Sequence, residues 1–362
     1  MKIGVLGSGQ LGRMLALSAY PLGHEMLFLA SSAEDPSSLL GNIFIQNGSQ
    51  EIIEDFANNS DVVTYESENT AISIVKEISQ KTMVYPSAKS LYTTQHRGRE
   101  KSLFDKLNIP CAPYQMVNNL SELKIAVENI GLPAILKTAT DGYDGKGQFL
   151  IQSDSQLDQA WKSMSGVESI LEGFVNFKRE LSLVAVRGVD NSHEYYPLVE
   201  NSHHNGILRL TIAPAQNISP KLQQQAESYM RSLLDEMNHV GVLTIELFET
   251  ENNLVVNEMA PRVHNSGHWT IEGARTSQFE NHIRAITETP LGNTSCTHEY
   301  SAMINIIGEQ GPIDKALTLK NAHLHLYNKT EREGRKLGHI TITANTLNDL
   351  NTSLETLSDF MP

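Results

Sequence analysis

The amino-acid sequence predicts an α/β protein that begins with a parallel sheet and changes to an α+β arrangement in its central part. Short apolar runs alternate with helix-like stretches over the first 90 residues, which is typical of βαβ units. Strand-rich segments then gather around one long predicted helix between residues 181 and 259. The chain has 362 residues, 40% of them hydrophobic, and a chain of this length usually forms more than one core. We therefore expect two or three domains.

The first predicted domain contains three strands, Lys2–Leu6, Met26–Leu29 and Val62–Thr64, with helical stretches between them. A mixed charged and apolar stretch from Gln95 to Leu107 is predicted to be a helix that connects to the next domain. Pro110 closes it, because proline resists continuation of a helix. This pattern indicates a Rossmann-like domain followed by a connector.

The middle of the chain holds a compact unit that we interpret as a mobile lid. Its strands Ala134–Thr138 and Ser169–Glu172 flank a glycine-rich loop. The later predicted elements are strands Leu181–Arg187 and Ile207–Ile212, a helix Pro220–Met237, a hairpin Gly241–Met259, and strands His323–Tyr327 and His339–Thr343. The predicted domains are 1–92, 93–290 with a lid at about 114–177, and a small β-rich domain 291–362.

Charge and composition exclude several kinds of partner. The formal net charge of −14 has the wrong sign for a protein that holds a nucleic-acid backbone. No run approaches the roughly 20 apolar residues that cross a bilayer, and the N-terminus is typical of a strand rather than a signal peptide. We therefore expect a cytoplasmic protein without nucleic-acid or membrane partners. Cys111 and Cys296 lack paired spacing and are interpreted as packing residues.

The first glycine-rich segment, Gly7–Gly12, follows a predicted strand and opens a helix, which is the local form of the dinucleotide-binding fingerprint. The acidic residue that would bind the ribose about 20 residues further on is absent, because that region reads Ala30-Ser31-Ser32. Three interpretations stay open. The segment is a dinucleotide site, a purely structural tight turn, or a pocket of backbone amides for another anion.

Two acidic residues stand in strand-like runs, Val242–Phe248 and Leu254–Met259, on either side of a polar turn, Glu249–Asn253. Folding about that turn places Glu246 almost opposite Glu258. Two facing carboxylates among apolar neighbours repel each other, so we expect a cation between them. Mg²⁺ is the best match, because it binds one or two carboxylates together with substrate phosphates. The alternative is that one or both side chains reach solvent at a strand edge.

A second glycine-rich segment, Asp141–Gln148, directly follows the apolar strand that carries Lys137. Its backbone N–H groups can lie against phosphates, with lysines as point charges. It is not a P-loop, because the Gly-Lys-Ser/Thr ending is missing. A flexible surface turn is the alternative, but it leaves a lysine in an apolar strand unexplained. Lys101 on the connector helix can supply a second charge.

These features together resemble the ATP-grasp superfamily; they are Lys101, Lys137, Gly142–Gln148, Glu172–Val175, Glu180, Glu246 and Asn257-Glu258. More narrowly, the whole chain resembles the N5-carboxyaminoimidazole ribonucleotide synthetase family of purine biosynthesis. The segments that carry this resemblance are Gly7–Met14, Thr64–Asn69, Gly142–Gln148, Asn257–Trp269 and Gly334–His339. The glycine segments are weak signals. The His-Asn-Ser-Gly-His-Trp end and the Gly-Arg-Lys-x-Gly-His stretch are specific.

The resemblance implies an ATP-grasp fold and an ATP-dependent carboxylate–amine ligase. In that family ATP phosphorylates bicarbonate to carboxyphosphate, and the carboxyl group reaches the exocyclic amine of 5-aminoimidazole ribonucleotide. The products are N5-carboxyaminoimidazole ribonucleotide, ADP and phosphate. A closing lid fits this chemistry, because the intermediate must be shielded from water. The resemblance also implies Mg²⁺ or Mn²⁺ as cofactor, ATP as co-substrate and a homodimer.

The resemblance assigns site residues one by one. Those for ATP are Arg97, Lys101, Lys137, Gly142, Tyr143, Asp144, Gly145, Lys146, Gly147, Gln148, Glu172, Gly173, Phe174, Val175, Glu180, His203, Asn257 and Glu258. Those for the metal are Glu246 and Glu258. Those for the chemistry are Arg262, His264, Asn265, Tyr143 and Asp144. Those for the ribonucleotide are Gln10, Leu11, Glu66, Glu68, Lys329, Arg335 and Lys336. A chain with a net charge of −14 repels a phosphorylated substrate, so it needs local cations to bind one. Lys329, Arg335 and Lys336 would provide these cations. A solvated loop is the alternative for this basic stretch.

One position departs from the family pattern. Where the family commonly reads Gln-Asp-Arg, this chain has Gln95-His96-Arg97, so the role of the acid is absent or pH-dependent here. A second ambiguity concerns His264 and His268, whose i, i+4 spacing also suits a zinc pair. The His-Glu-x-x-His arrangement and a third ligand are missing, which argues against zinc.

Four rival functions remain at this stage. A formate-using transformylase would need a different continuation after Pro261-Arg262, and a biotin carboxylase usually works with a Met-Lys-Met biotin lysine that is absent here. A dinucleotide-dependent oxidoreductase rests on the first glycine segment alone. A non-catalytic nucleotide-binding regulator would not need intact Lys137, Glu246 and Glu258.

Overall fold

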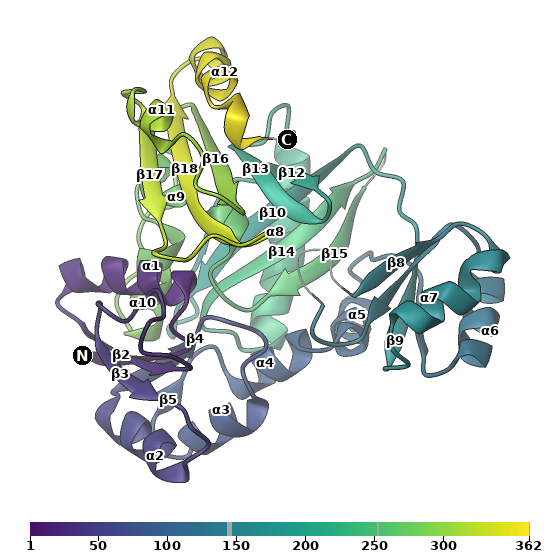
Figure 1. The fold of residues 1–362 in the computed structure, drawn as a ribbon, viewed down its shortest axis with the longest axis horizontal. Helices are drawn as coiled ribbons and strands as arrows, with labels where there is room; N and C mark the ends of the chain where they lie inside the picture. Colours follow the sequence, from purple (N-terminus) through teal and green to yellow (C-terminus); the bar gives the residue numbers. More distant parts are fainter. Residues whose placement is uncertain (143–146, 252, 362) are drawn as a thin grey trace.

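The structure of the chain is a computed structural model that describes residues 1–142, 147–251 and 253–361. Its named strands form three sheets, one at the N-terminus, one in the lid region and one that spans the rest of the molecule (Figure 1). Within these described ranges, no helix is long and apolar enough to span a bilayer. The predicted α/β class with a change to α+β is confirmed.

The N-terminal sheet is parallel, in the order β3-β2-β1-β4-β5. Its strands are β1 (Lys2–Leu6), β2 (Glu25–Ala30), β3 (Asn42–Ile45), β4 (Val62–Tyr65) and β5 (Met83–Val84). The helices of this region are α1 (Gln10–Ala19), η1 (Tyr20–Leu22), α2 (Gln50–Asn59), α3 (Ile72–Ile78) and α4 (Ala88–Thr94). The three strands predicted here are confirmed. The short strands β3 and β5 were not predicted, because two to four residues carry too little periodicity.

The lid region is an antiparallel sheet in the order β6-β9-β7-β8, covered by helices on one side (Figure 1). Its strands are β6 (Tyr114–Val117), β7 (Ala134–Thr138), β8 (Gln148–Ile151) and β9 (Ser169–Gly173). Its helices are α6 (Leu120–Ile130), η2 (Asp154–Gln156) and α7 (Leu157–Ser163). Leu123 and Ala126 of α6 pack with Leu136 and Leu171 of the sheet in a core separate from the others.

The predicted connector helix is α5 (Arg97–Lys106), two residues shorter at its start than expected. His96 adopts an extended conformation, and its Nδ1 accepts hydrogen bonds from the N–H groups of Gly98 (3.1 Å) and Arg99 (3.4 Å). His96 therefore caps the helix, which is a role that aspartate often fills. Its Nε2 also lies 3.2 Å from Glu168 of the lid.

The third sheet is antiparallel and has the order β15-β14-β10-β12-β13-β16-β18-β17, with β11 paired to β10. Its strands are β10 (Arg179–Arg187), β11 (His193–Tyr195), β12 (Val199–His204), β13 (Ile207–Ala213), β14 (Gly241–Glu249), β15 (Leu254–Ala260), β16 (Tyr300–Ile307), β17 (Ala322–Leu326) and β18 (Lys336–Ala344). The associated helices are α8 (Pro220–Glu236), η3 (Asn265–Gly267), α9 (Thr270–Gly273), α10 (Gln278–Ile286), α11 (Ile313–Leu317), α12 (Leu347–Thr356) and η4 (Ser358–Phe360). Pairing of β13 with β16 makes the sheet continuous across residue 290.

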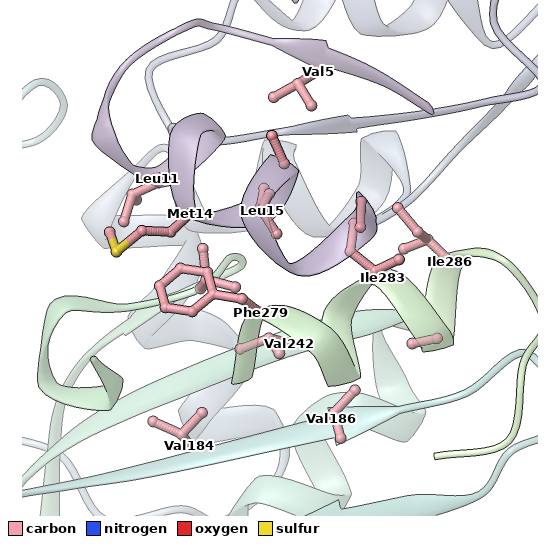
Figure 2. Close-up of a cluster of buried hydrophobic side chains, with 14 of the residues drawn as sticks. Val5, Leu11, Met14, Leu15, Val184, Val186, Val242, Phe279, Ile283 and Ile286 are labelled. Carbon is pink, nitrogen blue, oxygen red and sulfur yellow. The ribbon is translucent and has the colours of Figure 1, made fainter. Parts of the chain in front are cut away.

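Helix α10 lies between α1 and the third sheet and joins the N-terminal region to the centre of the molecule (Figure 2). Leu11 and Leu15 of α1 are buried in one cluster with Phe279 of α10 and with Val184 and Val242 of the sheet. The i, i+4 spacing puts the two leucines on one face of α1. This packing fixes the Gly7–Gly12 segment, which begins α1, relative to the strands that carry the acidic pair.

Candidate active site

The hairpin β14–β15 presents the two acidic residues at the centre of the site. Glu246 pairs with Glu258, and the next pair is Leu247 with Val256, so Asn257 is an extra residue in β15. Such a β-bulge re-aims side chains and is frequent beside active sites. The prediction that the two carboxylates face each other across a hairpin is confirmed.

Basic side chains of the protein approach both carboxylates, a guanidinium at Glu258 and an imidazole ring at Glu246. Arg97 Nη1 lies 2.8 Å from Glu258 Oε2, and His264 Nε2 lies 3.4 Å from Glu246 Oε1. Burial raises the pKa of Glu246, and the negative charge of Glu258 raises it further. Burial acts in the same direction on Glu258, but Arg97 and Lys137 outweigh it and lower the pKa of that carboxyl. The pKa values of the two glutamates are therefore shifted in opposite directions, and a further cation would stabilise the ionised form of both.

The donor set suits a hard divalent ion. Carboxylate oxygens are ligands that Mg²⁺ prefers, and Glu246 and Glu258 offer them from neighbouring strands. Over residues 1–142, 147–251 and 253–361, no three His, Cys, Asp or Glu side chains gather with the geometry of a metal centre. Mg²⁺ bound by one or two carboxylates commonly takes further ligands from nucleotide phosphates and water. The rings of His264 and His268 have protein partners, with His264 Nδ1 2.9 Å from Ser266 Oγ and His268 Nδ1 3.3 Å from Gln278 Nε2.

Two buried lysines meet an acidic residue beside the hairpin. Lys137 Nζ of β7 lies 2.9 Å from Glu172 Oε2 of β9, and Lys101 Nζ of α5 lies 3.6 Å from the same oxygen. Lys101 also donates to the Asn257 carbonyl at 2.7 Å. Lys137 is 7% exposed and Lys101 is 0% exposed, and burial lowers the pKa of Lys137. The lid, the connector helix and the bulge thus converge on one cluster of charges.

The glycine-rich lid segment borders this cluster. The Gly142 carbonyl accepts a long hydrogen bond, 3.5 Å, from Arg97 Nη2, while Gly147 has a φ of 68° that favours glycine. Gln148 pairs with Lys137 across β8 and β7. The other predicted members of the segment lie outside the described residues; they are Tyr143, Asp144, Gly145 and Lys146.

The residues that follow Glu172 leave β9 as an extended segment at the edge of the site. Gly173 and Phe174 donate their N–H groups to the carbonyls of Pro113 and Pro133 at 2.8 and 3.2 Å. Phe174 is exposed and Val175 is half-buried. The N–H groups of Gly173 and Phe174 are therefore occupied by protein carbonyls, whereas the ring of Phe174 offers apolar surface where the family resemblance puts the adenine.

Glu180 and His203 form a second polar pair on the third sheet. His203 Nδ1 of β12 lies 2.6 Å from Glu180 Oε2 of β10. Burial acts to lower the pKa of His203, but the Glu180 carboxylate and the charge of Glu246 outweigh it and raise that pKa. The pair lies next to the acidic hairpin, because β10 pairs with β14.

The loop after β15 reaches back to the N-terminal region. Arg262 binds both oxygens of Glu68, with Nη2 at 2.8 Å from Oε1 and Nε donating to Oε2. Burial acts to raise the pKa of Glu68, but this bidentate pair outweighs it and lowers the pKa to about 2. Burial and the charge of Arg262 lower the pKa of His264 to about 3, so its ring is neutral. Asn265 exchanges two amide hydrogen bonds with Asn305 of β16, at 3.0 and 2.7 Å.

The first glycine segment holds a carboxylate that belongs to the protein. Glu66 accepts hydrogen bonds from Gly9 N–H at 2.5 Å and from Gly12 N–H at 2.7 Å. These contacts give the segment a structural role, because its amides bind a carboxylate of the protein itself, and they agree with both the tight turn and the amide-lined pocket left open by the sequence. The side chain of Leu11 packs in the core, so only its backbone is available to a ligand.

The predicted basic residues follow β17, and one of them contacts the first glycine-rich segment. Lys329 donates a hydrogen bond to Gln10 Oε1, across 319 positions of the chain. Burial, then the charge of Arg335, lowers the pKa of Lys329 to about 8. Arg335 donates to Thr330 Oγ1 at 2.7 Å, and Lys336 begins β18, which starts three residues earlier than predicted.

Three polar residues of this region were not predicted. Glu100 of α5 accepts a hydrogen bond from Met259 N–H at 2.6 Å, Gln278 binds the backbone of His264, and Asn305 holds Asn265. The role of Asn305 could have been predicted, because Asn305, like Lys137, is a polar residue inside an apolar strand. Glu100 and Gln278 stand at helical positions where a polar residue is ordinary.

The fold and the site define an ATP-grasp protein. Residues 102–279 match the family model described as an ATP-grasp domain, residues 1–95 match a ribonucleotide synthetase preATP-grasp domain, and residues 301–353 match a phosphoribosylaminoimidazole carboxylase C-terminal domain. The chain is 46% identical to the N5-carboxyaminoimidazole ribonucleotide synthase of Pseudomonas aeruginosa over 343 residues, which cover 94% of each protein. It is 40% identical to that of Bacillus subtilis over 345 residues, 94% of this chain and 90% of the relative. The chain belongs to the N5-carboxyaminoimidazole ribonucleotide synthase family.

Solved structures agree with this membership. The crystal structure of the synthetase from Thermus thermophilus aligns with a TM-score of 0.94 and 45% identity, covering 99% of this chain and 98% of that one. The synthase from Aspergillus clavatus in complex with ADP and 5-aminoimidazole ribonucleotide aligns with a TM-score of 0.91 and 33% identity, covering 99% and 98%.

Proposed function

We propose that this chain is an ATP-dependent ligase that carboxylates 5-aminoimidazole ribonucleotide with bicarbonate in purine biosynthesis. ATP phosphorylates bicarbonate to carboxyphosphate, and its carboxyl group passes to the exocyclic amine. The products are N5-carboxyaminoimidazole ribonucleotide, ADP and phosphate. The proposal is supported by membership of the family and by relatives crystallised with ATP, with ADP and with the ribonucleotide.

One observation carries the proposal for this chain. Two facing carboxylates, Glu246 and Glu258, lie beside the buried lysines Lys101 and Lys137, which share Glu172. Phosphoryl transfer needs mainly positioning and charge neutralisation, and this cluster offers both without a covalent enzyme intermediate. A dinucleotide oxidoreductase receives no corresponding support, because the amides of the first glycine segment already bind Glu66.

Mg²⁺ or Mn²⁺ is the proposed cofactor, held by Glu246 and Glu258. A divalent ion there would neutralise charge that develops on the phosphates. Arg97, Lys101 and Lys137 are proposed to bind phosphates. Lys101 can do so while keeping its bond to the Asn257 carbonyl, because an ammonium group has three N–H donors. The segment Glu172–Val175 is proposed to hold the adenine, and the Glu180–His203 pair the ribose side.

The groups proposed to act on bicarbonate come from the loop after β15. Arg262 stays charged in its pair with Glu68, so it can bind an anionic carboxyphosphate. His264 is neutral and Asn265 is uncharged, so both can donate or accept hydrogen bonds without adding charge. Gln10, Glu66 and Lys329 are proposed to form the ribonucleotide pocket together with Glu68, Arg335, Lys336 and the backbone of Leu11.

Several further assignments are proposals that rest on the family resemblance. We propose a homodimer, a cytoplasmic location and the division of the chain into units 1–92, 93–290 and 291–362. Tyr143 and Asp144 are proposed to contact the imidazole. The lid at 114–177 is proposed to close over the reacting groups and exclude water.

The experiment is a phosphate-release assay with purified protein, ATP and Mg²⁺. Release is expected to be slow with either bicarbonate or 5-aminoimidazole ribonucleotide alone and to rise by at least about tenfold when both are present. A rate of phosphate release that does not change when bicarbonate and 5-aminoimidazole ribonucleotide are added would contradict the proposed function.

A further inference from the structure

Strand β15 is the last strand in the order of its sheet, and over the described residues its outer edge has only one isolated bridge, between Val256 and Cys111, where Val256 N–H donates to the Pro110 carbonyl at 2.8 Å. Two consecutive residues of α5 supply the missing hydrogen bonds there. Lys101 Nζ donates to the Asn257 carbonyl at 2.7 Å, and Glu100 Oε1 accepts from Met259 N–H at 2.6 Å. The two contacts stand immediately before and after Glu258.

These contacts act where the sheet itself holds the strand least. Asn257 is the extra residue of the bulge, and a bulge interrupts the ladder of backbone hydrogen bonds. Pairing with β14 therefore does not fix the backbone conformation at Asn257 as it does elsewhere in the hairpin. The side-chain contacts from α5 hold the backbone in place at this position.

The same face of α5 also reaches the carboxylate. Arg97, Glu100 and Lys101 are spaced i, i+3 and i+4, and Arg97 Nη1 lies 2.8 Å from Glu258 Oε2. Glu100 is 3% exposed and Lys101 is 0% exposed, so water does not compete for these contacts. The buried Glu100 carboxyl therefore satisfies a backbone N–H that water does not reach.

We propose that Glu100 is a positioning residue that, together with Lys101, clamps the bulge of β15 and so orients Glu258 toward a metal–nucleotide complex. This inference rests on the proposed function, because it assumes that Glu258 binds such a complex. Residues that orient metal ligands typically contribute 10- to 100-fold to metal affinity or activity, by order of magnitude. Glu100 acts through Glu258 and does not itself contact the metal or the nucleotide.

The test measures Mn²⁺ binding by electron paramagnetic resonance in the presence of a non-hydrolysable ATP analogue. Glu100→Ala removes the acceptor, and Glu100→Asp keeps the carboxyl group but withdraws its oxygen from Met259. Both are expected to weaken Mn²⁺ binding by about tenfold or more. Glu100→Gln keeps an acceptor oxygen at the same reach and is expected to stay within about threefold of the original protein.

Ser102→Ala is the matched control, because Ser102 is exposed on the same helix and its hydroxyl donates to the Gly98 carbonyl of that helix at 2.7 Å. It is expected to bind Mn²⁺ like the original protein. If Glu100→Ala does not fold, Glu100→Asp decides the matter. Unchanged Mn²⁺ binding in a folded Glu100→Asp, or an equal loss in Glu100→Gln, would overturn the proposal.

The assay contains neither bicarbonate nor 5-aminoimidazole ribonucleotide, so it separates this inference from the reaction itself. If the original protein binds Mn²⁺ and the Glu100 variants bind it equally well, the proposed clamp is overturned and the proposed function is not affected. Absence of Mn²⁺–nucleotide binding in the original protein would contradict the proposed function.

Discussion

Glu246 and Glu258 are the same amino acid in two environments. Arg97 Nη1 lies 2.8 Å from Glu258, whereas the neutral ring of His264 lies 3.4 Å from Glu246. Burial acts on both, and the nearby cations decide which carboxyl stays ionised. A ligand that brings positive charge would therefore change the protonation of Glu246 more than that of Glu258.

Glu258→Gln is expected to lower kcat by at least about 100-fold, because it removes a carboxylate ligand and leaves Arg97 without its partner. The thermal unfolding midpoint should change little, since the amide has nearly the same shape. Glu355→Gln, on the exposed surface of α12, is the control with the same chemical change. Steady-state rates near those of the original protein would remove Glu258 from the metal assignment.

His239 makes the stability of the fold depend on pH. Its ring is fully buried, with Nδ1 3.1 Å from Ser90 Oγ and Nε2 3.0 Å from the Val242 carbonyl. Burial lowers the pKa of His239 to about 4. The unfolded chain binds a proton near pH 6.5 and the folded one does not, so stability is lost as the pH falls from about 6.5 to about 4.

The loss carried by His239 is expected to be on the order of 2 kcal/mol at about pH 5. Urea unfolding at about pH 7.5 and about pH 5 measures it. His239→Gln should be less stable than the original protein at the higher pH but should lose less on acidification. Equal losses in both proteins would show that His239 does not carry this effect.

Single residues could be predicted where their chemistry conflicts with their surroundings. Lys137 in an apolar strand and the facing pair Glu246 and Glu258 were found in this way. Glu66 was assigned to a substrate pocket, but its contact with the first glycine segment depends on the pairing of β1 with β4, which the sequence does not state. The contact of Glu100 could not be predicted from the sequence, because its partner is a backbone N–H that lies far along the chain.

At the scale of elements, α1 and α10 connect the N-terminal region to the third sheet (Figure 2). Leu15 of α1 is 0% exposed within this contact, whereas Leu17 on the same helix is 46% exposed. The two positions therefore provide a test of the packing with the same substitution.

Leu15→Ala is expected to reduce the free energy of unfolding by about 2–5 kcal/mol, because it leaves a cavity in a packed core. Leu17→Ala is expected to change it by less than about 1 kcal/mol. Chemical denaturation of both variants measures the difference. Similar values for the two would mean that the α1–α10 contact contributes little to stability.

Elements with a strong period and clear end signals could be predicted closely. The hairpin of β14 and β15, the helix α8 and the strand β7 agree with the sequence to within one or two residues. The start of α5 was placed two residues too early, because histidine is not a usual capping residue and His96 was therefore not read as one.

At the scale of the whole molecule, the net charge of −14 opposes the binding of anionic substrates. Lys329, Arg335 and Lys336 are the cations proposed to hold the ribonucleotide phosphate. Lys329 donates a hydrogen bond to Gln10 of the first glycine-rich segment. Its positive charge therefore lies between that segment and the basic stretch.

Lys329→Gln is expected to raise KM for 5-aminoimidazole ribonucleotide by about tenfold and to leave kcat within about threefold, because a charge-assisted bond to phosphate contributes about 1.5–3 kcal/mol. Salt should raise KM of the original protein more than that of the variant. Lys320→Gln, at an exposed position before β17, is the control. An unchanged KM in Lys329→Gln would remove this residue from the substrate pocket.

The arrangement of whole regions was the part least accessible from the sequence. The order of strands within the third sheet places β13 beside β16, although α8, β14, β15 and α10 separate them in the chain. Such non-local pairing leaves no periodic signal. The family resemblance supplied the class of fold, but the continuous sheet across residue 290 became clear only from the pairing itself.

The most direct test of the account follows the carbon of labelled bicarbonate. The purified protein with ATP, Mg²⁺ and 5-aminoimidazole ribonucleotide is expected to incorporate labelled carbon into an acid-labile derivative of the ribonucleotide, with one ADP formed per carbon fixed. Incorporation should require ATP and fall by at least about 100-fold in Glu258→Gln. ATP consumption without transfer of the label to the ribonucleotide would contradict the account.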